Sequence, residues 1–110
     1  MTIIERVISQ YEELFEKSKK AKNTNHTLAN FFNNTSMARI LDIYLDNKDI
    51  WISLSDLVRL GISRKSIENN IPLLMEKGIL KEDFISPFKF YIWNNKNPQA
   101  KHLEKLRDIL

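Results

Sequence analysis

The feature of the sequence that most constrains the fold is a pair of short amphipathic helices joined by a tight turn, at residues 52–80 (ISLSDLVRLGISRKSIENNIPLLMEKGIL). Ser53, with Asp56 three residues later, is typical of a capping box, so the first helix is expected to begin directly after Ser53. Gly61 is expected to end this helix, because glycine readily adopts the positive φ of a tight turn. Ser63 can then cap a second helix. The segment therefore predicts a helix-turn-helix.

The second helix of this pair has an apolar side and a polar side. Ile67, Ile71 and Leu74 recur at steps of four and three and are expected to face the core. The opposite side and its edges are polar; they comprise Arg64, Lys65, Ser66, Glu68, Asn69 and Asn70. Pro72 removes one backbone donor and conflicts with the carbonyl of Glu68, so we expect a kink or an early end of the helix there.

After Gly78 the pattern changes from helical to alternating, in the segment LKEDFI. Ser86 and Pro87 predict a turn, and residues 89–93 (KFYIW) are rich in strand-forming side chains. Two short strands that directly follow a helix-turn-helix form a wing. The sequence therefore predicts a mainly α fold with a small β-hairpin wing, that is, a winged helix-turn-helix.

Further helices are expected on both sides of this unit. An amphipathic helix of about 18 residues starts the chain, a short helical turn follows around Leu28, a third helix covers about residues 37–46, and a short strand is expected at Trp51 and Ile52. A last helix starts near Gln99. The predicted organisation is a helix in residues 1–22, the winged helix-turn-helix in residues 27–95 and a helix in residues 96–110.

The apolar stripes of the two terminal helices predict a homodimer. We hypothesise that one or both helices pair across a twofold axis and so present two copies of the helix that begins after Ser63. The residues expected at this interface are Ile4, Val7, Ile8, Tyr11, Leu14, Phe15, Leu103 and Leu106. The alternative is that both helices pack on their own domain.

Composition narrows the classes of function. The chain of 110 residues is 43% hydrophobic, enough for one compact core, and it contains no Cys, so disulfides and thiolate metal sites are excluded and a cytoplasmic location is expected. Glu5 and Arg6 interrupt the N-terminal apolar stretch, so this stretch is not expected to be a secretory signal. No window reaches the roughly 20 apolar residues of a membrane span. His26 and His102 stand alone, without the carboxylate or second His of a metal or catalytic site. We therefore expect no enzyme activity, no metal, no cofactor and no membrane partner.

The charge of the chain permits a polyanionic partner without requiring one. The net charge is +3, with seven basic and seven acidic residues in residues 1–50 and six against five in residues 51–95. The lysines at 17, 19, 20 and 22 are interpreted first as cations that complement a helix C-terminus, with phosphate contact as the alternative. A case for DNA binding must therefore rest on architecture.

The polar side of the second helix suits contact with duplex DNA. Arg64 and Lys65 can reach guanine edges or phosphates, and Asn69 can bond adenine in two places, as can Asn70 if its orientation allows. Ser63 and Ser66, together with the helix N-terminus, can hold phosphate. The alternative is an ordinary solvated surface helix.

Three stretches carry a resemblance to a known family: FFNNTSMARILDIYLDN, LSDLVRLGISRKSIENNIPLLMEKGILK and FYIWNNKNP, followed by a helix. In this order they resemble the winged-helix transcriptional regulators of the broad ArsR/MarR-like group, in the form common in archaea, over about residues 28–105. The resemblance implies sequence-specific binding of double-stranded DNA by a dimer. By matching positions it assigns recognition to Arg64, Lys65, Ser66, Asn69 and Asn70, with support from Arg59.

The predicted wing departs from the family pattern. Its sequence KEDFISPFKF places Glu82 and Asp83 where family wings are often basic, so contact of the wing with DNA is doubtful and Lys89 is its best candidate. The acidic, apolar wing favours an alternative function, a winged-helix module that binds protein and no nucleic acid. A small-molecule effector is a further possibility, since several aromatic side chains could line a cleft, although aromatic residues at these spacings more often form the core; they are Phe31, Phe32, Tyr44, Trp51 and Trp93.

Overall fold

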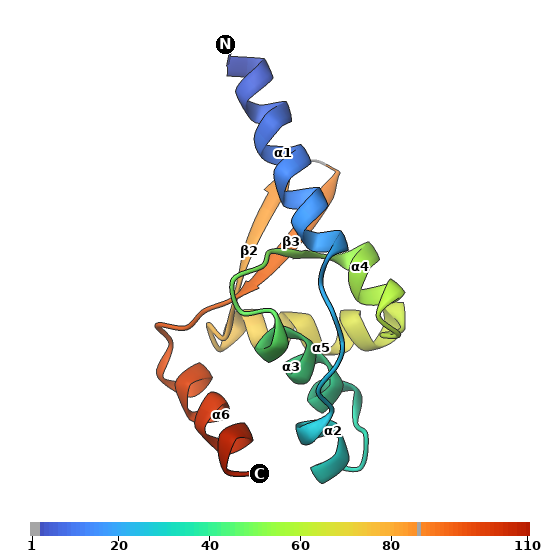
Figure 1. The fold of residues 1–110 in the computed structure, drawn as a ribbon, viewed down its shortest axis with the longest axis vertical. Coiled ribbons are helices and arrows are strands. Elements are labelled where there is room, and N and C mark those ends of the chain that lie inside the picture. Colours follow the sequence, from blue (N-terminus) through green and yellow to red (C-terminus); the bar gives the residue numbers. More distant parts are fainter. Residues whose placement is uncertain (1–2, 86) are drawn as a thin grey trace.

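The chain is mainly helical, with a small three-stranded antiparallel sheet (Figure 1). The computed structural model describes residues 3–85 and 87–110, with side chains from residue 9 onward. The elements are α1 (Ile3–Lys19), α2 (Thr27–Phe31), α3 (Ser36–Asp46), β1 (Ile52–Ser53), α4 (Leu54–Arg59), α5 (Arg64–Glu76), β2 (Leu80–Ile85), β3 (Phe88–Trp93) and α6 (Pro98–Ile109). The predicted turn includes Ser86, which lies outside the described residues.

Side-chain caps start α3, α4, α5 and α6, and the caps at Ser53 and Ser63 were predicted residue by residue from the sequence. Ser53 accepts a hydrogen bond from the backbone N–H of Asp56, and Ser63 accepts one from that of Ser66. Thr35 caps α3 in the same way, and Asn97 caps α6 one residue before Pro98. Short polar side chains thus set the starts of α3, α4, α5 and α6.

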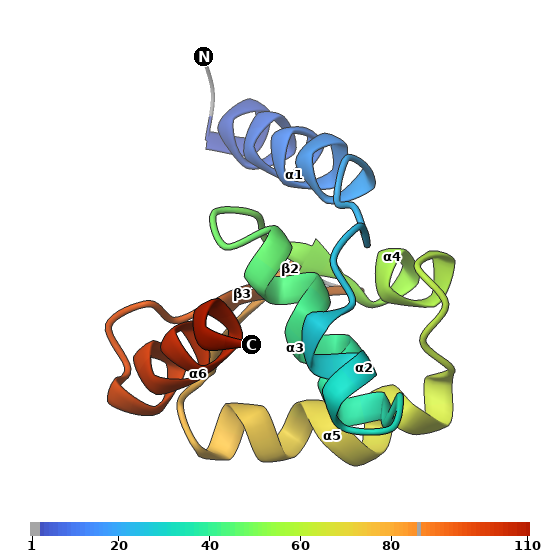
Figure 2. The ribbon, with the colours of Figure 1, turned by 60° about the horizontal axis from the view of Figure 1, so that its bottom comes forward.

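The sheet has the strand order β1-β3-β2, with β3 in the centre. Ile52 pairs with Tyr91, and Leu80 pairs with Trp93, so β1 and β2 flank β3 in antiparallel register. Figure 2 shows α3 in the middle of the domain, with α5 along one side of it and α4 and α6 at opposite ends. The largest fully buried apolar side chains are Tyr44, Phe90, Leu28, Ile40, Ile43, Ile52, Leu57, Ile62 and Leu80.

Pro72 does not end α5 early, in contrast to one of the two predicted outcomes. The helix continues through Pro72 to Glu76. Proline leaves the carbonyl of Glu68 without its usual helical donor. Both residues are exposed, so this carbonyl can be hydrated at the surface and the helix can pass the proline.

The C-terminal half of α1 packs on the hairpin of the same chain. The ring of Tyr11 lies 5.3 Å from that of Phe88 and 6.4 Å from that of Phe90, and the ring of Phe15 lies 6.2 Å from that of Phe88. Tyr11 and Phe15 therefore pack on the domain of their own chain, as in the alternative; both are half-buried, and their contact with a second chain stays a prediction. Leu14 is half-buried. The side chains of Ile4, Val7 and Ile8 lie outside the described residues.

The helix α6 is held against α3 by apolar and charged contacts. Leu103 and Leu106, predicted for a dimer interface, pack partly buried against the core of their own chain. Arg107, only 10% exposed, forms an ion pair with Asp46 and donates to the backbone carbonyl of Asp42 at 3.1 Å. The helix that ends the described chain is therefore part of the domain.

The carboxylate of Asp42 is fully buried, and it forms two hydrogen bonds and an ion pair. It accepts hydrogen bonds from the backbone N–H groups of Leu28 at 3.1 Å and Ala29 at 2.9 Å, which lie in the first turn of α2. The guanidinium Nε of Arg107 lies 3.8 Å from the same carboxylate. Because a buried charge is tolerated only with such partners, Asp42 joins α2, α3 and α6.

We expect Asp42→Ala to lower the free energy of unfolding by about 3 kcal/mol, because it leaves two buried N–H groups without their acceptor and removes one of the two carboxylates beside the largely buried guanidinium of Arg107. Urea unfolding followed by tryptophan fluorescence measures this change. The matched control is Asp49→Ala, at an exposed position after α3, which should change the free energy by no more than about 0.5 kcal/mol. Equal effects of the two variants would contradict the role of Asp42.

Among the described residues, no helix is both long enough and apolar enough to cross a membrane.

Candidate nucleic-acid interface

A turn of four residues, 60–63, connects α4 to α5 and is held in place by several hydrogen bonds. Gly61 adopts φ +98°, and the backbone N–H of the buried Ile62 donates to the carbonyl of Leu57 at 3.1 Å. Arg39 of α3 donates through Nη2 to the carbonyl of Gly61 at 2.7 Å. The turn is therefore anchored to the core and to α3. Arg39 also adds positive charge beside the start of α5. This placement was not predicted, because it joins residues 22 positions apart and no local pattern signals it.

The first two turns of α5 expose the residues predicted for base contact. Ile67 and Ile71 are buried on the inner side of the helix, as predicted. Arg64, Lys65 and Asn69 are all exposed. A helix that buries one side and exposes these three side chains on another can present them to a groove of DNA.

The side chains of Ser66 and Asn70 form hydrogen bonds within the fold. The hydroxyl of Ser66 lies 2.9 Å from that of Ser36, at the start of α3, and 2.9 Å from that of Ser63. Asn70 donates through Nδ2 to the carbonyl of Ser66 at 2.7 Å. The contact with Ser36 ties the first turn of α5 to α3, whereas the bond from Asn70 lies within α5. Both side chains therefore already have partners within the fold.

Arg59, predicted to support DNA binding, ties α4 to the end of α1. Its Nε donates to Asp56 at 3.1 Å, and its Nη2 donates to the carbonyls of Lys19 and Ala21 at 3.0 and 3.2 Å. Lys19 is the last residue of α1, where a helix leaves its last acceptors unpaired, and Ala21 follows it in the loop. The guanidinium thus forms three hydrogen bonds within the fold, so Arg59 is not part of the interface proposed below.

Asp56 is the centre of the same junction. The buried hydroxyl of Ser18 donates to its carboxylate, and Ser53 donates to the same oxygen at 2.8 Å. Ser18 in turn accepts from the backbone N–H of Ser53 at 2.7 Å. Burial acts to raise the pKa of Asp56, but the hydrogen bonds from Ser18, Ser53 and Arg59 and the charge of Arg59 outweigh it, so the pKa lies below its usual value.

This junction predicts a defined pH dependence of stability. Because the pKa of Asp56 is lower in the folded chain than in the unfolded chain, where it is about 3.9, its contribution is fully present above that value and is lost as the pH falls through the folded pKa. We expect wild type to be more stable than Asp56→Asn at pH 7, with a difference that shrinks below about pH 4. Urea unfolding across this range measures it.

The control for this series is Asp83→Asn, at an exposed position in β2, which should show no comparable change with pH. A difference between wild type and Asp56→Asn that grows as the pH falls would contradict the role assigned to Asp56.

The hairpin brings acidic groups beside α5. Glu82 and Asp83 on β2 are exposed, and Glu82 lies with Glu68 and Glu76 of α5 along a groove between the helix and the strands. Lys89, the predicted wing contact, lines the same groove. The groove was not predicted, because it depends on how the hairpin is placed against α5.

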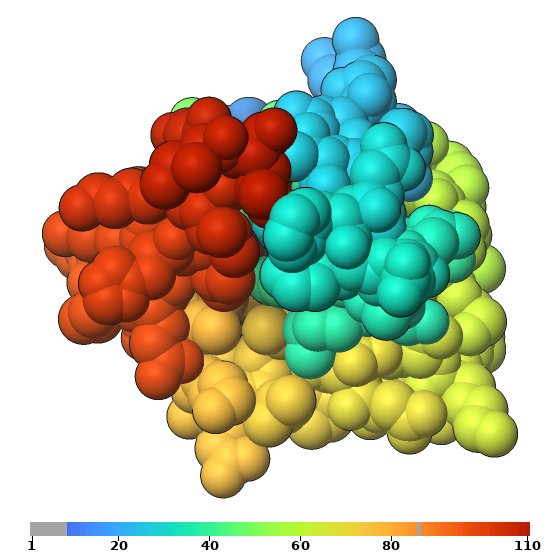
Figure 3. Space-filling view, turned by 90° about the horizontal axis from the view of Figure 1, so that it is seen from below, coloured from blue at the N-terminus to red at the C-terminus, as the bar shows by residue number. Residues whose placement is uncertain are grey.

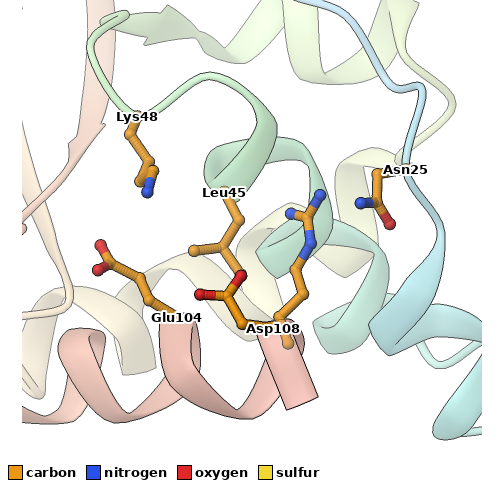
Figure 4. A pocket seen from close by; sticks show the side chains of 6 residues that line it. Asn25, Leu45, Lys48, Glu104 and Asp108 are labelled. Atoms are coloured by element: carbon orange, nitrogen blue, oxygen red, sulfur yellow. The ribbon is translucent and has the colours of Figure 1, made fainter. Parts of the chain in front are cut away.

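A second, smaller hollow of about 160 Å³ lies between α3 and α6 (Figure 4). Two of the charged groups that line it have partners within the fold: Arg107 binds Asp46, and Glu104 accepts from Trp93 Nε1 at 2.8 Å. Across the described ranges, no three His, Asp or Glu side chains gather as metal ligands do. His26 and His102 are exposed. We assign no chemistry to this hollow.

Comparison of the chain with protein-family models, with curated proteins and with solved structures found no match.

Proposed function

We propose that this chain is a winged helix-turn-helix transcriptional regulator that binds duplex DNA through the first two turns of α5. The observation that carries the proposal is the exposed set Arg64, Lys65 and Asn69 on a helix whose other side is buried. The order α3, β1, α4, α5, β2, β3, with sheet order β1-β3-β2, supports it, because α4 and α3 brace α5 while the hairpin follows directly.

Charge confines the proposed contact to the N-terminal half of α5. Arg39, Arg64 and Lys65 lie at or beside this end, and the helix N-terminus itself favours a phosphate next to Ser63. Glu68 in the second turn, and Glu76 and Glu82 farther along, line the side of α5 that faces the hairpin and would repel the phosphate backbone there. DNA contact by the hairpin is therefore expected to be minor, with Lys89 as its best basic candidate.

We expect duplex DNA to bind with an affinity that falls steeply as salt rises, and Arg64→Ala with Lys65→Ala to weaken binding about tenfold or more. A gel-shift titration at several salt concentrations measures both effects. The control is Lys101→Ala with Lys105→Ala, which removes the same charge from exposed positions on α6. If both double variants weaken DNA binding equally, the assignment of the contact to α5 is wrong.

We further propose that the chain acts as a homodimer through the N-terminal half of α1. This half projects beyond the hairpin and away from the rest of the domain (Figure 1), and its sequence places Ile4, Val7 and Ile8 on one stripe. A helix with such a stripe needs a partner in water. A dimer would offer two recognition helices and so supply affinity that the modest charge of one chain does not.

Light scattering at micromolar concentration is expected to give twice the 13.0 kDa mass of the chain, and Ile8→Glu is expected to give the mass of the single chain. The reason is that a carboxylate in an apolar helix pair is strongly disfavoured. The control is Val58→Glu, at an exposed apolar position on α4, which should leave the mass doubled. A measured mass of 13.0 kDa for the wild-type protein would contradict the dimer proposal.

A protein-binding module remains the second candidate, because an apolar patch is exposed at the end of the domain opposite α1. Phe31 and Phe32 are 60% and 44% exposed, unlike Tyr44 and Trp93, which form part of the core. Leu110 borders the same hollow as Phe31, and α2 lies beside the end of α6 in Figure 3. If this candidate is right, duplex DNA will not bind even at low salt.

A further inference from the structure

The groove between α5 and the hairpin is large and has an apolar floor. Its volume is about 600 Å³, within the range of pockets that hold drug-sized molecules. Ile71, Pro72 and Met75 of α5 line one wall, and Tyr91 of β3 lines the other. A ligand in this groove would therefore contact apolar surface from both elements.

The rim of the groove is acidic. It carries the carboxylates of Glu68 and Glu76 on α5 and of Glu82 on β2, against the single ammonium group of Lys89 on β3. Three negative charges against one positive charge give the rim a negative balance. An apolar floor beneath such a rim disfavours anions and matches a molecule that combines a positive charge with an apolar body.

The pairing of β2 with β3 reinforces this preference. Glu82 and Tyr91 lie directly opposite each other in the two strands, and both line the groove. Burial raises the pKa of Tyr91, and the nearby charge of Glu82 raises it further. The wall formed by the hairpin thus combines an aromatic side chain with a carboxylate, which favours a positive charge there.

We propose that the groove between α5 and the hairpin binds a lipophilic organic cation, a small molecule with a bulky apolar body and a permanent positive charge. The cation would lie near Glu68, Glu76 and Glu82, with its apolar body on Ile71, Met75 and Tyr91. The size of the groove suits a small molecule better than a peptide helix, which is about 10–12 Å across. This inference does not depend on DNA binding.

The first experiment is titration calorimetry with two probes of nearly identical shape and opposite charge, tetraphenylphosphonium and tetraphenylborate, at low ionic strength and without DNA. We expect tetraphenylphosphonium to bind with one site per chain and at least tenfold more tightly than tetraphenylborate. Absence of tetraphenylphosphonium binding at millimolar concentration, or binding of the anion as tight as that of the cation, would overturn the proposal.

The second experiment repeats the tetraphenylphosphonium titration on charge variants, which keep their size and remain at the surface. Glu68→Gln, Glu76→Gln and Glu82→Gln should each weaken binding about two- to fivefold, and Lys89→Gln should tighten it by a similar factor. The matched control is Glu12→Gln, at an exposed position on α1, which should leave affinity unchanged. Equal weakening by the control, or failure of Lys89→Gln to tighten binding, would place the cation elsewhere and overturn the assignment.

Discussion

The carboxylate of Asp42 lies at the centre of this domain, fully buried on α3, and two distant parts of the chain are attached to it. It accepts hydrogen bonds from the first turn of α2, and the guanidinium of Arg107 on α6 lies beside it. A buried charge is costly unless its partners are present, so removal of any one partner destabilises the others. The arrangement therefore couples α2, α3 and α6 into one body.

A second junction, around Asp56, does the same for α1 and α4. Ser18 of α1 and Arg59 of α4 both bind the Asp56 carboxylate, and Arg59 also donates to the carbonyl of Lys19, the last residue of α1. Together the two junctions hold the flanking helices by polar contacts within the fold. The exposed first two turns of α5 are left available to a partner, which is why the proposed function falls on them.

Local features of the fold could be predicted from the sequence, and long-range ones could not. Ser53 and Ser63 form caps through residues only three positions away, so their role is visible in the sequence. Arg107 meets Asp42 and Asp46 across more than sixty residues, and no local pattern signals such a pairing. The stripe containing Tyr11 and Phe15 looks the same whether its partner is a second chain or the hairpin. The exposed residues of the proposed site were predictable from helical spacing, whereas the occupied guanidinium of Arg59 and the acidic groove beside Lys89 were not.

The central claim is that the N-terminal half of α5 contacts duplex DNA. A titration of the ¹⁵N-labelled chain with short duplex DNA of mixed sequence, followed by two-dimensional NMR at low salt, tests it residue by residue. The account predicts that the largest shifts of backbone amide signals fall between Ser63 and Asn70, with small shifts in α6. Shifts confined to α6 or the hairpin, or no shifts at all, would contradict it.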